Sequence, residues 1–269
     1  LNCSFICNNK SYLQFLSNYT LSSIIKMNYF IKCFGIKKRF GSKEVLKGID
    51  LNVEEGNTLV ILGGSGSGKS VLLKTTIGLI KPDEGTILIE GENVTSYSEK
   101  EWFIVRKKVS YMFQWVALFD SMTVFDNVAF PLREMKIPED VVKEKVFEKL
   151  NILGLNDAHS LFPQDLSGGM KKRVALARSI ISEPKCILYD EPTAGLDPIT
   201  ANQINKLIRK MQEMLNITSV VVTHDIKSTF YVADKVAFLY DGKISFYGTL
   251  EESQKDGNEI LKAFISGGE

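Results

Sequence analysis

The segment that most constrains this chain is Gly63-Gly-Ser-Gly-Ser-Gly-Lys-Ser70. It fits the pattern G-x-x-x-x-G-K-[ST], and it lies between an apolar run at residues 58–62 and a predicted helix at residues 70–80. Glycines in such a loop allow consecutive backbone N–H groups to point inward, and the N-terminus of the helix adds positive potential. A flexible Gly/Ser turn needs neither a Lys-Ser pair nor a helix directly behind it. The segment therefore predicts a loop that binds the phosphates of a nucleotide.

Every residue of this loop is expected to line the nucleotide site: Gly63, Gly64, Ser65, Gly66, Ser67, Gly68, Lys69 and Ser70. The Lys69 ammonium is predicted to bridge the β- and γ-phosphates, and the Ser70 hydroxyl is predicted to bind Mg²⁺. The expected ligands are therefore a nucleoside triphosphate and Mg²⁺.

An acidic pair, Asp190 and Glu191, follows the apolar run that begins at Cys186. A nucleoside triphosphatase needs a carboxylate at the end of a buried strand. We predict that Asp190 holds Mg²⁺ through water and that Glu191, one residue past the strand, is the general base that polarises the attacking water. For the pair taken alone, an acidic strand end that caps the next helix is the alternative. The phosphate-binding loop favours the catalytic interpretation.

Hydrophobic periodicity predicts an α/β chain with a helical insertion. Apolar runs predict a hairpin that turns at Asp241-Gly242 and strands at residues 31–40, 45–53, 58–62, 86–90, 109–113, 186–190 and 218–223. Helical spacing predicts a mainly helical segment from about 115 to 181, and helices at residues 70–80, 198–215 and 226–233.

These elements predict one nucleotide-binding domain at residues 28–250, with the helical subdomain inserted at about 115–181. Residues 1–27 are rich in Asn, Ser, Tyr and Leu, and we expect them to be a poorly ordered extension. Residues 251–269 are expected to be a C-terminal tail.

Composition excludes several classes of protein. The 33 Lys and Arg and 32 Asp and Glu residues give a formal net charge of +1, so no basic face for nucleic acid or anionic lipid is expected. No window reaches about 18 uninterrupted apolar residues, so we expect any membrane role to come through a partner. The four cysteines form no CxxC pair, which favours a reducing compartment.

The segment Leu166-Ser167-Gly168-Gly169 lies between the phosphate-binding loop and the acidic pair. In this order it matches the signature of ATP-binding cassette (ABC) ATPases, and the resemblance runs from about residue 31 to residue 248. It implies a P-loop NTPase core with a mixed sheet, an antiparallel β edge and a helical insertion. It also implies that the nucleotide is ATP and that the protein hydrolyses it.

The resemblance assigns roles to further residues. Phe40 falls where the family places an aromatic ring that stacks on adenine, with a core strand residue as the alternative. Gln114 resembles the glutamine that touches Mg²⁺ and the attacking water and links to the helical insertion. Asp197 matches a loop that signals across a dimer, and His224 resembles the switch histidine that hydrogen-bonds the γ-phosphate.

The same resemblance implies a head-to-tail dimer with a second copy of the chain. Ser167, Gly168 and Gly169 of one subunit lie at a helix N-terminus, where they would contact ATP held by the other subunit's phosphate-binding loop. One chain alone then has half of each active site. Hydrolysis removes the γ-phosphate between the halves and separates the two helical insertions.

Finer features resemble the MlaF/Mkl group, whose members power lipid movement between membranes. They are Val71 after the loop serine, Met170 after the signature, and the stretch Ala117-Leu-Phe-Asp120. The resemblance implies an MlaE-like permease and an MCE-domain protein as partners, and lipid contact only through the permease. It places the chain peripherally on the cytoplasmic face of the inner membrane.

Two other functions stay open. One is the ATPase subunit of an importer of polar solutes such as amino acids. The other is a soluble ABC ATPase of iron–sulfur cluster assembly, although that group shows Glu after its signature glycines and lacks the Ala-Leu-Phe-Asp stretch. One departure from the MlaF/Mkl pattern is Trp115-Val116, where a small Ser-Gly pair is expected. Trp115 is predicted either to pack on the permease or to belong to the core.

Overall fold

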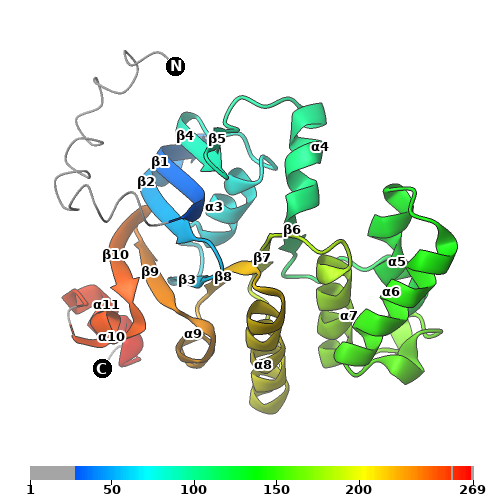
Figure 1. Ribbon diagram of the computed structural model, residues 1–269. Helices are drawn as coiled ribbons and strands as arrows, with labels where there is room; N and C mark the ends of the chain where they lie inside the picture. Colours follow the sequence, from blue (N-terminus) through cyan, green and yellow to red (C-terminus); the bar gives the residue numbers. More distant parts are fainter. Residues whose placement is uncertain (1–27, 256, 268–269) are drawn as a thin grey trace.

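The computed structural model describes residues 28–255 and 257–267, so the predicted extension at residues 1–27 lies outside the described part. Two sheets meet in this part of the chain (Figure 1). The smaller sheet is antiparallel, with the order β2-β1-β4-β5, and its strands are β1 (Tyr29–Phe40), β2 (Lys43–Glu54), β4 (Glu84–Ile89) and β5 (Glu92–Asn93).

The larger sheet has the order β10-β9-β3-β8-β7-β6. All of its neighbouring pairs are parallel except the hairpin of the last two strands in the chain. Its strands are β3 (Thr58–Leu62), β6 (Val109–Met112), β7 (Cys186–Asp190), β8 (Thr218–Thr223), β9 (Lys235–Tyr240) and β10 (Lys243–Thr249). Every residue of β3, β7 and β8 is buried, as expected for parallel strands that are covered on both faces.

The described part of the chain has the helices α3 (Lys69–Thr76), α4 (Glu99–Lys108), α5 (Val124–Glu134), α6 (Glu139–Ile152), α7 (Gly168–Ile180), α8 (Pro198–Leu215), α9 (Ile226–Val232), α10 (Leu250–Lys255) and α11 (Glu259–Ile265). Two short 3-10 turns, η2 (Asn156–Ala158) and η3 (Pro163–Asp165), join α6 to α7. Figure 1 shows α5, α6 and α7 together on one side of the molecule, away from the smaller sheet. The chain is therefore an α/β core with a helical insertion, as predicted.

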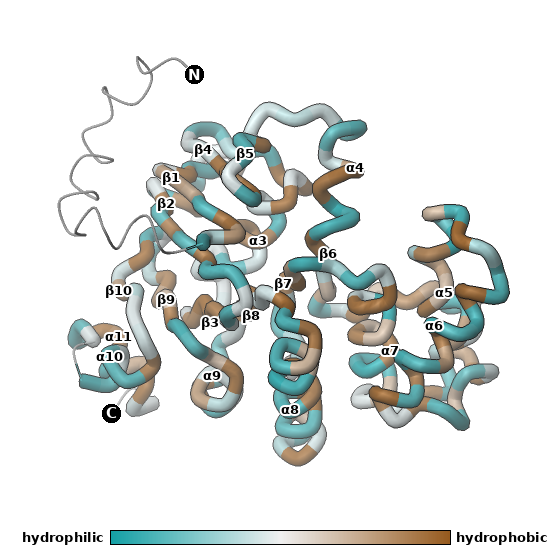
Figure 2. The backbone as a smooth tube through the Cα atoms, viewed as in Figure 1, coloured by the Kyte–Doolittle hydropathy of each residue, from teal (hydrophilic) through white to brown (hydrophobic). Residues whose placement is uncertain are grey.

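Apolar faces fix how the helices sit on the core. In α8 the buried residues are Ile204, Asn205, Ile208 and Met211, a spacing that places them on one face. Figure 2 shows the same helix with both teal and brown bands. One apolar cluster joins the insertion to the sheet, since Val128, Val146 and Leu176 belong to the same cluster as Tyr189 and Val221. The insertion thus packs against the sheet beside β7, the strand that leads into the acidic pair.

Two elements differ from the sequence prediction. The helix predicted to run to residue 80 ends at Thr76. Gly78 follows with φ +69°, and a Cβ at this position would lie 2.1 Å from the Trp102 ring, so the chain turns where that indole packs. Helix α4 was not predicted, because only Trp102 and Val105 of its ten residues are buried. Its N-terminus is nevertheless fixed by a capping box between Ser98 and Glu101.

The C-terminal segment forms α10 and α11 in the described part of the chain. Leu261 of α11 is fully buried and clusters with Leu62, Val236 and Phe238 of the large sheet. Asn258 caps this helix, with its side-chain oxygen accepting from Leu261 N at 2.8 Å. Residues 251–255 and 257–267 therefore extend the core on the side of β9.

Candidate active site

The phosphate-binding loop connects β3 to α3 at the carboxyl edge of the parallel sheet. Gly66 and Gly68 have φ +74° and +105°, which favours glycine at both positions. Close packing also requires glycine at Gly63, where a Cβ would lie 2.5 Å from Leu239 O. The Ser67 hydroxyl oxygen is buried and has no hydrogen-bond partner in the described structure. Backbone geometry and an unsatisfied buried hydroxyl both fit a loop that takes oxygen-rich groups.

Lys69 is the first residue of α3, and its side chain turns back over the loop. The residue is 6% exposed, and Nζ donates to Gly63 O at 2.8 Å and to Gly64 O at 3.0 Å. The same ammonium lies 3.4 Å from Glu191 Oε1. The structure therefore brings the predicted phosphate ligand and the predicted general base into contact.

Asp190 is held by two hydroxyl groups. Ser70 Oγ donates to Asp190 Oδ1 at 2.6 Å, and the Tyr111 hydroxyl donates to Oδ2 at 2.8 Å. Burial, and next the negative charge of Asp190, raises the pKa of Tyr111, so its hydroxyl stays protonated and keeps donating. The Ser70 and Asp190 oxygens are of the type that Mg²⁺ prefers, and they fit a site that phosphate oxygens and water would complete. Sequence analysis did not predict Tyr111.

Glu191 directly follows β7 and adopts an unusual backbone conformation, with φ +47°. Its N–H donates to Val222 O at 3.0 Å, which fixes the turn beyond the strand. The carboxylate is buried, and His224 Nδ1 lies 3.1 Å from Oε1 and 3.0 Å from Oε2. An ionised carboxylate only accepts hydrogen bonds, so the tautomer of His224 that carries a proton on Nδ1 suits this contact. The His224 side chain is 59% exposed, so its other edge faces solvent.

A buried lysine that the sequence analysis missed joins these segments. Lys172 of α7 is 3% exposed, and its Nζ donates to Gln114 O at 2.7 Å and to Glu191 O at 3.3 Å. Burial lowers the pKa of this lysine. It lies five residues after Ser167, but its partners depend on tertiary packing, so no sequence signal marked it.

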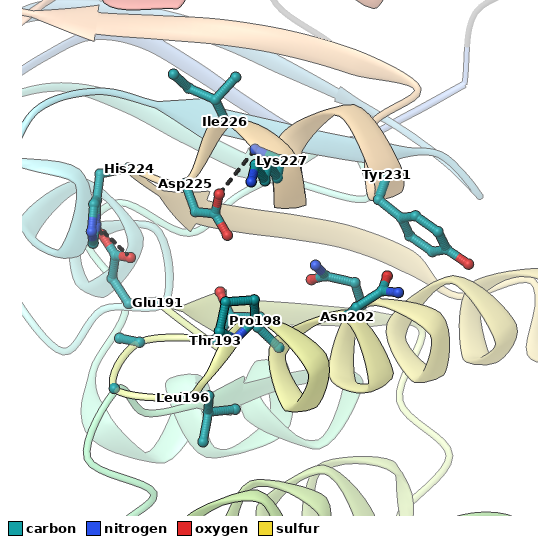
Figure 3. A pocket seen from close by; sticks show the side chains of 14 residues that line it. Glu191, Thr193, Leu196, Pro198, Asn202, His224, Asp225, Ile226, Lys227 and Tyr231 are labelled. Carbon is teal, nitrogen blue, oxygen red and sulfur yellow. Dashed lines mark hydrogen bonds and ion pairs between the residues drawn. The ribbon is translucent and has the colours of Figure 1, made fainter. Parts of the chain in front are cut away.

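A hollow of about 380 Å³ lies beside Lys69, Ser70 and Glu191, whereas Asp190, Tyr111 and Lys172 are not among the residues that line it. Gln114, Glu191 and His224 line it together with residues of the phosphate-binding loop, Lys43 and Val45. A neighbouring cavity of about 930 Å³ shares Glu191 and His224 and extends between α8 and α9 (Figure 3). In that view Glu191 and His224 point toward each other at one end, and Asn202 and Tyr231 lie at the other. The predicted catalytic residues therefore converge on one region.

The signature residues do not line this hollow. Ser167 caps α7 and accepts from Met170 N at 3.2 Å, with Gly168 and Gly169 following it. A Cβ on Gly169 would lie 2.5 Å from Thr200 Cγ2, so the signature packs against the start of α8. Asp197 caps that helix by accepting from Ile199 N and Thr200 N at 3.0 Å each. The hydrogen bonds from Thr200 lower the pKa of Asp197. The structure thus groups the signature with Asp197, apart from the chain's own phosphate-binding loop.

Phe40 also lies outside the residues that line the hollow. It ends β1 with 48% of its surface exposed, and Lys38 Nζ lies 5.6 Å from its ring centroid. The alternative prediction of a core position is therefore wrong for this ring. An exposed aromatic face at the end of β1 is free to stack on a flat ligand.

Residues 46–194 match the ABC transporter family, and the chain belongs to that family. It is an ABC ATPase of the kind that serves a transporter, as the sequence analysis predicted. Solved structures agree with this fold. The chain resembles cbiO1 from Clostridium perfringens with a TM-score of 0.79 and 34% identity, covering 88% of this chain and 94% of that one. It also resembles the ATP-binding cassette MJ0796, a dimer bound to ADP and Pi, with a TM-score of 0.75 and 32% identity over 82% and 98% of the two chains.

Among curated relatives, the chain is 42% identical to the intermembrane phospholipid transport system ATP-binding protein MlaF of Escherichia coli (strain K12), over 84% of this chain and 85% of that protein. It is 37% identical to the probable ribonucleotide transport ATP-binding protein mkl of Mycobacterium leprae, over 90% of this chain and 70% of that protein. The methionine import ATP-binding protein MetN of Legionella pneumophila (strain Paris) is 41% identical to this chain, over 80% of this chain and 63% of that protein. The predicted likeness to the MlaF/Mkl group is confirmed.

Proposed function

We propose that this chain hydrolyses Mg²⁺-ATP to power the movement of phospholipid between membranes. The observation that supports ATP hydrolysis is a single hollow lined by Gln114, Glu191 and His224 together with Lys69 and Ser70. The lipid substrate is supported by the 42% identity with MlaF, a phospholipid transport protein by name, over 84% of this chain.

The residues around the hollow have distinct roles in this proposal. Lys69 and the loop N–H groups bind the phosphates, and Phe40 stacks on adenine. Ser70, Asp190 and Gln114 hold Mg²⁺, which neutralises charge on the phosphates when it is bound. The 2.6 Å bond between Ser70 and Asp190 supports this because it already pairs two of these ligands.

Glu191 is the proposed general base. Its carboxylate is buried next to the phosphate-binding loop, where it would accept the proton of the attacking water. His224 Nδ1 and Lys69 Nζ both contact this carboxylate and restrict its orientation. The exposed edge of His224 would then contact the γ-phosphate.

A second copy of the chain is the proposed first partner. Ser167, Gly168, Gly169 and Asp197 lie away from the chain's own hollow, so their predicted contacts with ATP need another subunit. The backbone N–H groups at the start of α7 suit an anionic ligand. The likeness to MJ0796, a cassette solved as a dimer, supports a head-to-tail pair.

A membrane permease is the proposed second partner. Trp115 is 86% exposed, which fits an aromatic anchor at an interface better than a core residue. We propose an MlaE-like permease that works with an MCE-domain protein and carries the lipid, with this chain on the cytoplasmic face of the inner membrane. In the described part of the chain, no helix combines the length and apolar character needed to cross a bilayer.

Import of a polar solute is the second candidate function. The 41% identity with MetN, a methionine import protein by name, favours it, although the match covers 63% of that protein against 85% of MlaF. The two candidates share the ATPase site and differ in the permease and its cargo.

The test is affinity purification of the chain from native membranes in mild detergent, with mass spectrometry of co-purifying proteins and lipids. An MlaE-like permease, an MCE-domain protein and enriched phospholipid would support the proposal. A different permease with a solute-binding protein would favour polar-solute import. Recovery only from the soluble fraction would contradict both and favour an iron–sulfur assembly ATPase.

A further inference from the structure

The loop after Gln114 is held by the guanidinium group of Arg178. From α7, Nη1 of this arginine donates to Ala117 O at 2.8 Å and Nη2 donates to Val116 O at 2.9 Å. The guanidinium also lies 5.9 Å from the Phe119 ring centroid. Arg178 forms no ion pair in residues 28–255 and 257–267. Its N–H groups therefore donate to backbone carbonyls of the loop and not to a carboxylate.

The two residues whose carbonyls accept these bonds have a strained backbone. Val116 and Ala117 are both left-handed, with φ 62° and 48°. L-residues disfavour this region because Cβ approaches the next carbonyl oxygen, and a β-branched residue there is a clear outlier. Such a conformation persists only where its surroundings over-determine it.

The other contacts of the loop involve side chains and N–H groups, since Val116 and Leu118 pack against the apolar cluster of the insertion. Val116 N donates to Phe113 O at 3.0 Å, and Ala117 N donates to Trp115 O at 2.6 Å. These bonds close the turn through its N–H groups. The guanidinium is the group that donates to both carbonyl oxygens, and its planar fork suits two acceptors side by side.

Because Arg178 and the loop are partly buried, losing one hydrogen-bond partner leaves the other group without full compensation from water. Arg178 is half-buried, and this desolvation lowers its pKa. Its carbonyl acceptors replace lost water contacts, and the carbonyls in turn need a donor. The guanidinium and the two loop carbonyls therefore supply each other's hydrogen-bond partners.

The two hydrogen bonds from Arg178 to Val116 O and Ala117 O form a clamp on the loop, and two functional side chains directly precede it. Gln114 lines the nucleotide hollow, and Lys172 holds its carbonyl oxygen at 2.7 Å. The next residue, Trp115, is 86% exposed. The left-handed turn that begins at Val116 follows directly, so a change there would displace Trp115 and turn the Gln114 side chain about the carbonyl that Lys172 holds.

We propose that Arg178 is a positioning residue that holds Val116 and Ala117 in their left-handed turn and thereby fixes Trp115 and Gln114, which directly precede it. Loss of its two hydrogen bonds relaxes Val116 and Ala117 toward ordinary backbone conformations. The conformation of Trp115 reports the clamp directly, whereas the hydrolysis rate depends in addition on the role proposed above for Gln114.

The chain offers an optical probe for this test. It has two tryptophans, of which Trp102 is 5% exposed and Trp115 is 86% exposed. Subtracting the emission of Trp115→Phe from that of the parent isolates the Trp115 signal. In the full chain, Arg178→Gln is expected to lower the fluorescence anisotropy of that signal, because the freed loop moves on a nanosecond timescale. Arg178→Lys, with one cationic group for two carbonyls, should give an intermediate value.

Arg173→Gln is the matched control. Arg173 lies on the same helix, and its Nη1 donates to the carbonyls of Leu153 and Gly154 at 3.1 and 3.0 Å. It holds a different loop by the same kind of bond. A general loss of helix packing would affect both variants, whereas the clamp predicts a change of Trp115 anisotropy in Arg178→Gln alone.

ATP hydrolysis gives the second readout. Arg178→Gln is expected to lower kcat about tenfold with KM for ATP nearly unchanged, since Gln114 is misplaced while the phosphate-binding loop is intact. Parent-like Trp115 anisotropy in Arg178→Gln, with thermal unfolding showing a folded protein, would overturn the clamp. Lower anisotropy with parent-like kcat would support the clamp and contradict the role proposed for Gln114.

Discussion

The Ser70 hydroxyl donates a 2.6 Å hydrogen bond to Asp190 Oδ1, although 120 residues separate the two in sequence. The contact exists because β3 and β7 flank β8 in the same parallel sheet, so their carboxyl ends lie at one edge. Tyr111 donates to the second carboxylate oxygen at 2.8 Å. Both oxygens of Asp190 thus have a fixed direction before any ligand binds.

Tyr111→Phe removes one of these two bonds and little else. We expect the affinity for Mn²⁺ in the presence of ADP, measured by electron paramagnetic resonance, to fall about fivefold, since one hydrogen bond contributes about 1 kcal/mol. Thermal stability should change little. Tyr97→Phe, which removes a tyrosine hydroxyl that interacts with Glu92, should leave the metal affinity at its parent value. Equal metal affinity in the parent and Tyr111→Phe would argue against a role for Tyr111 in orienting Asp190.

Lys69→Ala should weaken ATP binding about 100-fold or more, because each charge-assisted hydrogen bond to phosphate contributes about 1.5–3 kcal/mol. Isothermal titration with ATP measures the loss. Lys74→Ala, on the same helix but not among the residues that line the hollow, should bind ATP like the parent. Retained affinity in Lys69→Ala would exclude the buried ammonium as the main phosphate ligand.

Ser167→Arg should abolish hydrolysis and leave ATP affinity unchanged if, as proposed, Ser167 acts on a nucleotide held by the other subunit. Ser98→Arg is a suitable comparison, since Ser98 likewise begins a helix but lies away from the signature. Both variants lose a helix cap worth about 1 kcal/mol, and only Ser167→Arg should lose activity. A matching loss of ATP affinity in Ser167→Arg would contradict a site shared between subunits.

Gly78→Ala should lower the free energy of unfolding by about 3 kcal/mol, as a Cβ at this position would lie 2.1 Å from the Trp102 ring and φ is +69°. Gly91→Ala separates the two causes. Its φ is +80°, but nothing lies within 4 Å of the added Cβ, so only the backbone cost of about 1 kcal/mol remains. Urea unfolding measures both, and similar losses would show that the indole yields to the added methyl group.

Local sequence patterns predicted the core of the site. The phosphate-binding loop, Asp190 and Glu191 could be placed because each is defined by a short motif and its neighbouring strand. Helix α8 was predicted with its observed bounds, Pro198–Leu215, since its apolar period and the following turn are both local signals. Such features depend on residues close together in the chain.

Contacts set by tertiary packing could not be predicted. Tyr111 reaches Asp190 through the parallel register of β6 on β7, and Lys172 reaches Gln114 through the packing of α7. No residue spacing encodes either contact. Helix α4 was missed for a related reason, because most of its residues face solvent and its apolar period is weak.

Glu191 is the proposed general base of a site completed by a second copy of the chain. Glu191→Gln keeps the shape of the side chain and removes its basicity, so ATP should bind and persist. Size-exclusion chromatography with light scattering on Glu191→Gln, with and without Mg²⁺-ATP, tests this most directly. We predict a dimer of about 60 kDa only with ATP, from two chains of 30.2 kDa each. A protein that stays monomeric at saturating ATP, with bound nucleotide absent, would contradict the account.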